Sequence, residues 1–539
     1  MKISGNLIDI FKRDIYPAEI SHEKGVITGI RRISKSNQHY IMPGLIDAHI
    51  HIESSMVTPG SFAASAVSRG TTAVISDPHE IANVLGIDGV KYMIEDANKV
   101  PLKFFFGAPS CVPATEFETN GAAIDQEGVE TLLQRPEIKY LSEMMNYPGV
   151  IHEDPVVMAK IKSAHYHKKP VDGHAPGLAG EDLKKYISAG ITTDHECSTI
   201  EEAREKISLG MKILMREGSA ARNLDNLKEL LKTDPGMVML CSDDLHPEML
   251  VKGHIDRLVS RLINEGYDLF DVIRCCTLNP VNHYGIDAGL LRPGDPADFI
   301  LVRDYHTMGI EETWINGIKV FGEGHVLFRY QGTGAINKFN STGVRAGDVE
   351  VVHPEGKMRV IEATDGEIIT GEISVQSGGK GPISTDIKND ILKLVVKDRY
   401  NDAPPVVAFI KGFGLRSGAF ASSIAHDSHN IICVGVSDND IVAAINRVVE
   451  MRGGLAVAMC NTIDYLPLGI SGIMSPEPVE TVAAGYELLS AKVRNLGCNL
   501  SAPFMTLSFM ALLVIPALKL SDKGLFDVNQ FRFVPLFYG

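Results

Sequence analysis

The feature that most constrains the fold of this chain is a sequence pattern that repeats between residues 41 and 285. A short apolar run is followed by a polar turn and then by a segment with helix-like spacing of apolar residues, which is typical of parallel βα units. The apolar runs begin near residues 41, 72, 103, 140, 170, 191, 212 and 237. Eight such units in about 250 residues predict a (β/α)8 barrel. An open, doubly wound sheet is the main rival, but no glycine-rich dinucleotide fingerprint follows any of these runs.

Helices are predicted between the runs because apolar residues recur there at three- and four-residue spacings. Clear examples span residues 88–99, 155–167, 181–189 and 200–209. The expected fold class is therefore α/β, with a TIM-like barrel over residues 41–285.

The segments that flank the barrel predict two further domains. Residues 1–40 and 289–324 have the pattern of short strands and turns, which predicts one small β-domain split between residues 1–40 and 286–345. Beyond residue 345 come alternating strands at 358–375, 390–398 and 406–412 and helices at 440–452 and 479–496. Residues 346–539 are therefore expected to form a separate C-terminal α/β or α+β domain.

Charge and cysteine usage exclude several classes of protein. The net charge is −15 and no dense run of lysine or arginine is present, so neither nucleic acid nor membrane is an expected partner. The eight cysteines are scattered and none forms a C-x-x-C pair, which argues against a disulfide framework and a cysteine zinc site. The first residues lack the apolar core of a secretion signal, so a cytoplasmic location is expected. The apolar stretch 504–518 is shorter than the ~20 residues of a membrane span and predicts a buried helix.

Two histidines end the first predicted strand. His49 and His51 lie two residues apart, and side chains at that spacing on a strand point to the same side, so both imidazoles can bind one metal ion. A lone H-x-H also occurs as an ordinary surface pair, so the test is whether other strand ends carry ligands at the same rim. The fourth, fifth, sixth and eighth strand ends do, with Glu143, His174, His195 and Asp243.

This set of nitrogen and oxygen donors suits zinc, manganese or iron. Six ligands exceed the needs of one tetrahedral site, so two divalent ions bridged by a carboxylate are the more economical interpretation. Glu143 is the best candidate for the bridge.

The arrangement of these ligands resembles the amidohydrolase superfamily, and the split β-domain agrees with it. Many binuclear members of that superfamily bridge their metals with a carbamylated lysine on strand four. Glu143 stands in that region here, which argues against ordinary hydantoinase or dihydroorotase chemistry.

Longer motifs resemble the adenine deaminase family more specifically. They span residues 49–56, 76–84, 143–150, 172–176, 425–430 and 468–474, so the likeness extends along nearly the whole chain. It implies hydrolysis of adenine to hypoxanthine and ammonia in purine salvage and adenine catabolism. It also implies two divalent ions per chain, with manganese or iron expected and zinc as an alternative, and a homodimer. The competing hypotheses are a superfamily hydrolase that acts on another aminopurine or a cyclic amide, and a non-catalytic barrel scaffold.

Catalytic roles are predicted for three of the ligands. Asp243 is expected to accept a proton from the attacking water and pass it to the departing amine. Glu143 is a second candidate for that shuttle, and His195 completes the predicted catalytic group.

Further residues have both a functional and a structural interpretation. The candidates for purine binding or for orienting the ligands, each of which could instead stabilise a loop or turn, are Asp77, His79, Glu80, Glu53, Ser54 and Asn146. His426 and His429 suit an additional site or a surface turn equally well. Strand alternation should turn Asp244 and Glu196 away from the ligands, so each is expected either to support the ligands from behind or to form a structural ion pair.

Overall fold

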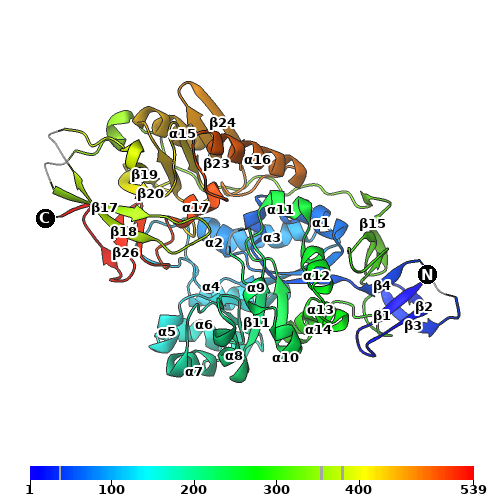
Figure 1. Cartoon of the computed structure of the whole chain (residues 1–539). Coiled ribbons are helices and arrows are strands. Elements are labelled where there is room, and N and C mark those ends of the chain that lie inside the picture. Colours follow the sequence, from blue (N-terminus) through cyan, green and yellow to red (C-terminus); the bar gives the residue numbers. More distant parts are fainter. Residues whose placement is uncertain (36–37, 220, 353–355, 378–380, 539) are drawn as a thin grey trace. The chain divides into compact units, whose positions relative to one another are not determined.

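The computed structural model describes residues 1–35, 38–219, 221–352, 356–377 and 381–538 (Figure 1). By their contacts the residues divide into two compact units. The first unit comprises Met1–His79, Val90–Cys111 and Ile124–Thr333, and the second comprises Glu80–Gly89, Val112–Ala123 and Gly334–Gly539. Two short stretches from within the predicted barrel segment therefore group with the C-terminal residues, and the domain boundaries drawn from the sequence stay predictions.

The first unit holds eight consecutive parallel strands among its described residues. They are β5 (Leu45–Ile50), β6 (Thr71–Ser76), β7 (Lys103–Ala108), β8 (Ile138–Met144), β9 (Val171–Gly173), β10 (Thr193–Asp194), β11 (Lys212–Arg216) and β12 (Val238–Cys241). Strands β5 to β9 pair in order, and so do β10 to β12. A bridge between Val171 and Ile191 joins the two sets, and a bridge between Ile50 and Asp243 closes the ring. The predicted barrel fold is confirmed.

Alternation along the buried strands builds two cores. On β11, Ile213 and Met215 join an apolar cluster that contains residues of the surrounding helices, such as Leu258. Leu214, between them, belongs to a separate cluster with residues of other barrel strands, such as Ile46. Because both faces of each strand are covered, the strands are buried and most of them are largely apolar, which explains why the runs were visible in the sequence.

Helices connect the barrel strands along the chain. In chain order they are η1 (Ile52–Ser55), α1 (Pro59–Ser68), α2 (His79–Leu85), α3 (Ile87–Ala97), α4 (Gln126–Leu133), α5 (Tyr147–Ile151), α6 (Pro155–Tyr166), α7 (Gly180–Ser188), α8 (Ile200–Ser208), α9 (Leu224–Leu227), α10 (Leu230–Thr233), η2 (Pro235–Met237), α11 (Pro247–Lys252), α12 (Ile255–Asn264), α13 (Leu269–Cys275) and α14 (Leu278–Tyr284). The four predicted helices correspond to α3, α6, α7 and α8 within two residues at each end. Side-chain caps define several starts, for example at α6, where Asp154 accepts hydrogen bonds from the amides of Val156 and Val157.

A second sheet of the first unit combines strands from two separate parts of the chain. Its strands are β1 (Lys2–Asp9), β2 (Asp14–Glu23), β3 (Val26–Arg32), β4 (Tyr40–Pro43), β13 (Phe299–Val302), β14 (Ile310–Ile315), β15 (Ile318–Gly322) and β16 (His325–Val326). Their order is β16-β15-β14-β13-β4-β1-β2-β3.

The prediction that the first barrel strand begins near residue 41 was wrong. Tyr40–Pro43 belongs to the second sheet, and the barrel strand begins only at Leu45. Gly44 lies between the two, where a Cβ atom would come within 2.1 Å of the Thr72 hydroxyl. The chain can change sheets here because this position has no side chain.

The second unit is built on a nine-stranded sheet, counted over its described residues. The strands are β17 (Gly356–Glu362), β18 (Gly371–Ser377), β19 (Leu392–Lys397), β20 (Val406–Lys411), β21 (Ala419–Ser422), β22 (Ile431–Gly435), β23 (Gly454–Met459), β24 (Thr462–Pro467) and β28 (Phe537–Tyr538). The order is β18-β17-β20-β19-β22-β21-β23-β24, with β28 beside β17. The predicted strand at 358–375 is in fact the hairpin of β17 and β18.

Helices cover both faces of this sheet. On β21, Ala419 and Ala421 pack with residues of α15 (Asp438–Met451). Phe420, between them, points the other way and contacts Phe504 of α17 (Pro503–Phe509), with ring centroids 5.1 Å apart. Helix α16 (Val479–Asn495) also packs against the sheet (Figure 1).

The apolar stretch 504–518 is helical only over its first part. Helix α17 ends at Phe509, and Leu518–Ser521 forms β25, which pairs with β26 (Gly524–Asp527) and, through it, β27 (Arg532–Phe533). Pro516 cannot donate a helical hydrogen bond, so a continuous helix to residue 518 is disfavoured. Within the described ranges, no helix combines the length and the apolar character needed to cross a membrane.

Lys519 of β25 predicts a pH dependence of stability. Its fully buried ammonium donates to the carbonyls of Ile368 at 2.7 Å and Phe509 at 3.0 Å, and burial lowers its pKa to about 7 from 10.5. The folded state therefore binds fewer protons than the unfolded state between these values, so stability should rise with pH across that window. The slope from this group reaches about 1.4 kcal/mol per pH unit and vanishes below the folded pKa.

Urea denaturation of the full chain between pH 6 and about 10 checks this expectation. The variant Lys519→Met should lose that part of the slope, whereas Lys393→Met, which removes a buried lysine paired with Asp438 at 2.5 Å, should keep it. Equal slopes in the wild type and Lys519→Met would contradict the prediction.

Candidate metal centre

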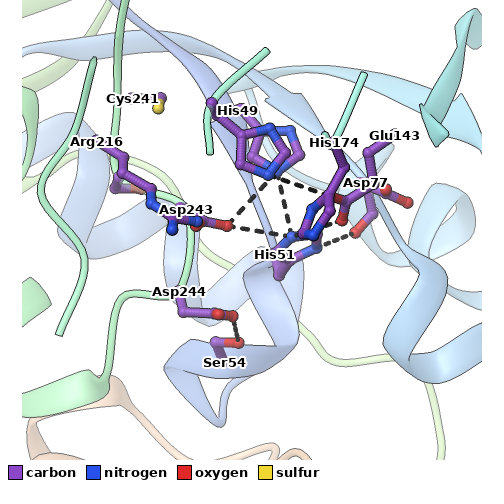
Figure 2. Close-up of polar contacts among 12 residues, drawn as sticks. His49, His51, Ser54, Asp77, Glu143, His174, Arg216, Cys241, Asp243 and Asp244 are labelled. Atoms are coloured by element: carbon purple, nitrogen blue, oxygen red, sulfur yellow. Dashed lines mark hydrogen bonds and ion pairs between the residues drawn. The ribbon is translucent and has the colours of Figure 1, made fainter. Parts of the chain in front are cut away.

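The six predicted ligands converge at the carboxyl ends of the barrel strands. His49 lies in β5 and Glu143 in β8. The other four follow within two residues of the ends of β5, β9, β10 and β12, and they are His51, His174, His195 and Asp243. All are buried except His174, which is partly exposed. Parallel strands of a barrel end at one common rim, so residues far apart in the chain meet there (Figure 2).

Glu143 lies between two groups of histidines. Its Oε1 atom is 3.3 Å from Nε2 of His51. Its Oε2 atom is 2.6 Å from Nδ1 of His174 and 3.1 Å from Nε2 of His195. Each carboxylate oxygen therefore faces a different part of the ligand set.

Asp243 lies on the other side of His49 and His51 from Glu143 (Figure 2). Its Oδ1 atom is 3.2 Å from Nε2 of His51 and 3.5 Å from Nε2 of His49. The two imidazole Nε2 atoms are themselves 3.2 Å apart. Buried nitrogen and carboxylate donors that converge at these spacings match the ligand set of a divalent metal. Among the residues that the structure describes, His49 Nδ1 has no hydrogen-bond partner.

The backbone of Asp243 is hydrogen-bonded to the end of the first barrel strand. Its amide donates to the carbonyl of His49 at 2.9 Å, and its carbonyl accepts from the amide of His51 at 3.3 Å. Asp243 has a φ of 58°, a left-handed conformation that few residues other than glycine adopt. Asp47 supports the same junction by accepting from the amides of His49 at 3.3 Å and Ser242 at 3.0 Å.

Burial and mutual charge shift the pKa values of the ligands. Burial alone would raise the pKa of Glu143, but His174 and His195 hold it well below its usual range. Burial likewise opposes ionisation of Asp243, yet Arg216 and the two histidines of the first strand keep its pKa well below normal. Burial tends to lower the pKa of His195, but Glu143 and Asp243 raise it to about 9. The carboxylates of the cluster are therefore ionised near neutral pH.

Asp77 and His79 lie beside the ligands in the same unit. The carboxylate of Asp77 is 3.2 Å from Nδ1 of His79, which is in turn 3.4 Å from Glu143. The carbonyl of Asp77 is 3.1 Å from Nδ1 of His51. With His51 and Glu143 they form a further group of donors that could hold a metal ion.

The other predicted contact residues have local roles in the structure. The hydroxyl of Ser54 donates to Asp244 at 2.5 Å, and Glu53 is buried in η1. Asn146 caps helix α5 by accepting from the amide of Gly149 at 2.9 Å, in keeping with the turn interpretation.

The expectation that Glu196 points away from the ligands was wrong. Strand β10 ends at Asp194, so strand alternation does not extend to His195 and Glu196. The Glu196 carboxylate comes within 3.5 Å of His195 and 3.7 Å of His174 and forms an ion pair with Arg216. Sequence reasoning missed Arg216, although it ends the seventh barrel strand, because only acids and histidines were sought at the strand ends.

In the second unit, Glu80 lies between the two histidines that were predicted as a possible additional site. One carboxylate oxygen is 2.6 Å from Nδ1 of His426, and the other is 2.6 Å from Nε2 of His429. All three side chains are buried, so the surface-turn interpretation of the histidines was wrong.

Comparisons with known proteins agree with this architecture. Residues 40–320 match the model of the amidohydrolase family, and residues 367–532 match that of the adenine deaminase C-terminal domain. A protein of Methanosarcina mazei named adenine deaminase is 52% identical over 99% of both chains. The adenine deaminase of Methanosarcina barkeri is 53% identical over 99% of both chains, and that of Salinibacter ruber is 50% identical over 99% of this chain and 98% of its own. This chain therefore belongs to the adenine deaminase family, with an amidohydrolase domain followed by an adenine deaminase C-terminal domain.

Proposed function

We propose that this chain hydrolyses adenine to hypoxanthine and ammonia at a pair of divalent metal ions on the barrel rim. Relatives named adenine deaminase match the whole chain at about half identity, which supports the reaction. The observation that carries the site is the position of Glu143, whose two oxygens face different groups of histidines. The alternatives of another aminopurine, a cyclic amide or a scaffold without activity have no support in these comparisons.

The two oxygens of Glu143 face different histidines. His51 lies near Oε1, and His174 and His195 lie near Oε2. His49 and Asp243 lie near His51 and form a further group of donors with His195. In a paired-metal site, Glu143 would hold the two ions through its two oxygens. Bound divalent ions would act there as Lewis acids and lower the pKa of a water ligand from 15.7 to about 7.

Acidic side chains of this protein carry out the proposed proton transfer. Deamination consumes one water, and one of its protons must reach the amino group before ammonia departs. Asp243 can accept that proton on Oδ1, the oxygen that faces His49 and His51, and later release it to the amine. Glu143 remains a second candidate for the shuttle, and His195 contacts it at 3.1 Å. Asp77 and His79 are proposed to orient the ligands or hold the purine.

Several finer predictions from the sequence stay predictions. They are the choice of manganese or iron over zinc, the cytoplasmic location, the homodimer, the part played in purine salvage and the additional site at His426 and His429. For the last of these, the shared contact with Glu80 is the supporting observation.

An ammonia assay tests the proposed function. Protein expressed with manganese, iron or zinc should release ammonia from adenine and contain about two ions per chain. Adenosine and cytosine, offered side by side, should react far more slowly. A preference for adenosine or cytosine would contradict the proposed substrate, and activity that survives complete chelation would contradict the metal centre.

A further inference from the structure

Arg216 places a buried guanidinium between two acids of the rim, Glu196 and Asp243. Figure 2 shows the side chain of Arg216 directed at Asp243. Its Nη2 atom donates to Oε2 of Glu196 at 2.8 Å, and its Nη1 atom contacts Oε1 of the same carboxylate. Nη1 also donates to Oδ2 of Asp243 at 2.6 Å. Both N–H groups of Nη1 and one N–H group of Nη2 are therefore engaged by acids of the chain.

This contact makes the two oxygens of Asp243 different. Oδ2 is held by Arg216, and Oδ1 is thereby directed at His51 and His49, at 3.2 and 3.5 Å. The guanidinium is planar and keeps its charge, so it fixes the plane of the carboxylate as well as its position. The position of the Asp243 backbone is fixed as well, by its left-handed φ and by its hydrogen bonds to the first strand.

Arg216 also determines what Glu196 can do. Oε1 of Glu196 is 3.5 Å from His195 and 3.7 Å from His174, close enough to join the ligands if it were released. Its bidentate pair with Arg216 keeps both oxygens occupied. The cation also separates two buried carboxylates that would otherwise repel each other.

The side chain of Asn223 connects Arg216 to the segment that contains His195. Its side-chain oxygen accepts from the amide of Arg216 at 2.8 Å, and its nitrogen donates to the carbonyl of His195 at 2.9 Å. Arg216, at the end of β11, and His195, a candidate metal ligand, are thus hydrogen-bonded to the same side chain.

We propose that Arg216 and Glu196 form a positioning pair that directs Oδ1 of Asp243 at the metal centre and keeps Glu196 out of the ligand set. The inference rests on the proposed deaminase function and its metal centre. It assigns Arg216 to orienting Asp243, without contact to the purine.

The test uses the full chain with Arg216→Ala and measures two quantities. Manganese affinity is measured by competition with a coloured chelator, and kcat and KM for adenine are measured at saturating manganese. Affinity and kcat should each fall by about 10- to 100-fold, as expected when a group that orients a metal ligand is removed, while KM changes by less than about twofold. Guanidinium ion at low millimolar concentration should restore both quantities, because it can refill the cavity left by the side chain.

A matched control removes a partly buried cation of the same unit. Lys103 begins β7, at the opposite end of the strands from the rim, and pairs with Asp298 at 2.6 Å. Lys103→Met should leave manganese affinity and kcat unchanged, with no response to guanidinium. Unchanged affinity and kcat in Arg216→Ala would overturn the proposal, and so would losses that guanidinium fails to repair.

A second variant keeps the test decisive if Arg216→Ala does not fold. Glu196→Gln preserves the shape of the side chain but removes the charge that holds the guanidinium, so affinity and kcat should fall in the same direction. Wild-type values in Glu196→Gln would also overturn the positioning pair. If the wild type itself releases no ammonia, the proposed function fails, whereas the affinity measurements still decide the role of Arg216.

Discussion

Replacing Glu143 by glutamine is expected to abolish deamination and to reduce the metal content below two ions per chain. An amide has one oxygen acceptor where the carboxylate has two charged ones, and in this structure the two oxygens face different histidine groups. The site then loses its bridge and a negative charge together. Activity should fall by more than about 10⁴-fold, because the ions and the proton transfer fail at the same time.

Metal analysis and the ammonia assay on Glu143→Gln check this result. Glu130→Gln is a matched control because Glu130 also contacts an imidazole, that of His167, at 2.7 Å, but does so on helix α4. This control should keep two ions and activity within about twofold of the wild type, since surface ion pairs contribute little. Two ions and high activity in Glu143→Gln would refute the bridging role.

Replacing Asp243 by asparagine should lower kcat by about 10² to 10⁴-fold, the usual contribution of a general acid or base. Asparagine keeps the size of the side chain, and its oxygen can still accept from Arg216, but it cannot carry a proton between water and amine. Measured with saturating manganese, the loss should appear mainly in kcat. A kcat close to that of the wild type would show that another group, such as Glu143, moves the proton.

Asp256→Asn controls for the chemical change itself. Asp256 is buried in the same unit, and burial raises its pKa above the ordinary value. Its Oδ1 accepts from the amide of His254 at 2.6 Å, which an asparagine oxygen can also do. Deamination by this variant should match the wild type within about twofold. A loss of activity in Asp243→Asn then cannot be explained simply by the replacement of a buried carboxylate with an amide.

The elements of the fold were visible in the sequence wherever burial covers both faces of a strand or one face of a helix. The eight apolar runs became β5 to β12, and the helices α6 to α8 were predicted almost to the residue, because periodicity reports burial directly. Periodicity does not report the sheet to which a strand belongs. The split at Gly44 and the grouping of Glu80–Gly89 with the C-terminal unit depend on partners far away in the chain.

The sequence by itself determined which residue types stand at the strand ends, because a closed parallel barrel brings all those ends to one rim. The candidate ligands that follow from it are His49, His51, Glu143, His174, His195 and Asp243. Tertiary structure alone decided how they are used. That each oxygen of Glu143 faces its own histidines, that Glu196 turns inward and that Arg216 holds Asp243 follow from side-chain packing between neighbouring strand ends. The contacts of Arg216 with Glu196 and Asp243 join residues 20 and 27 positions apart. No local pattern in the chain carries a signal at that separation.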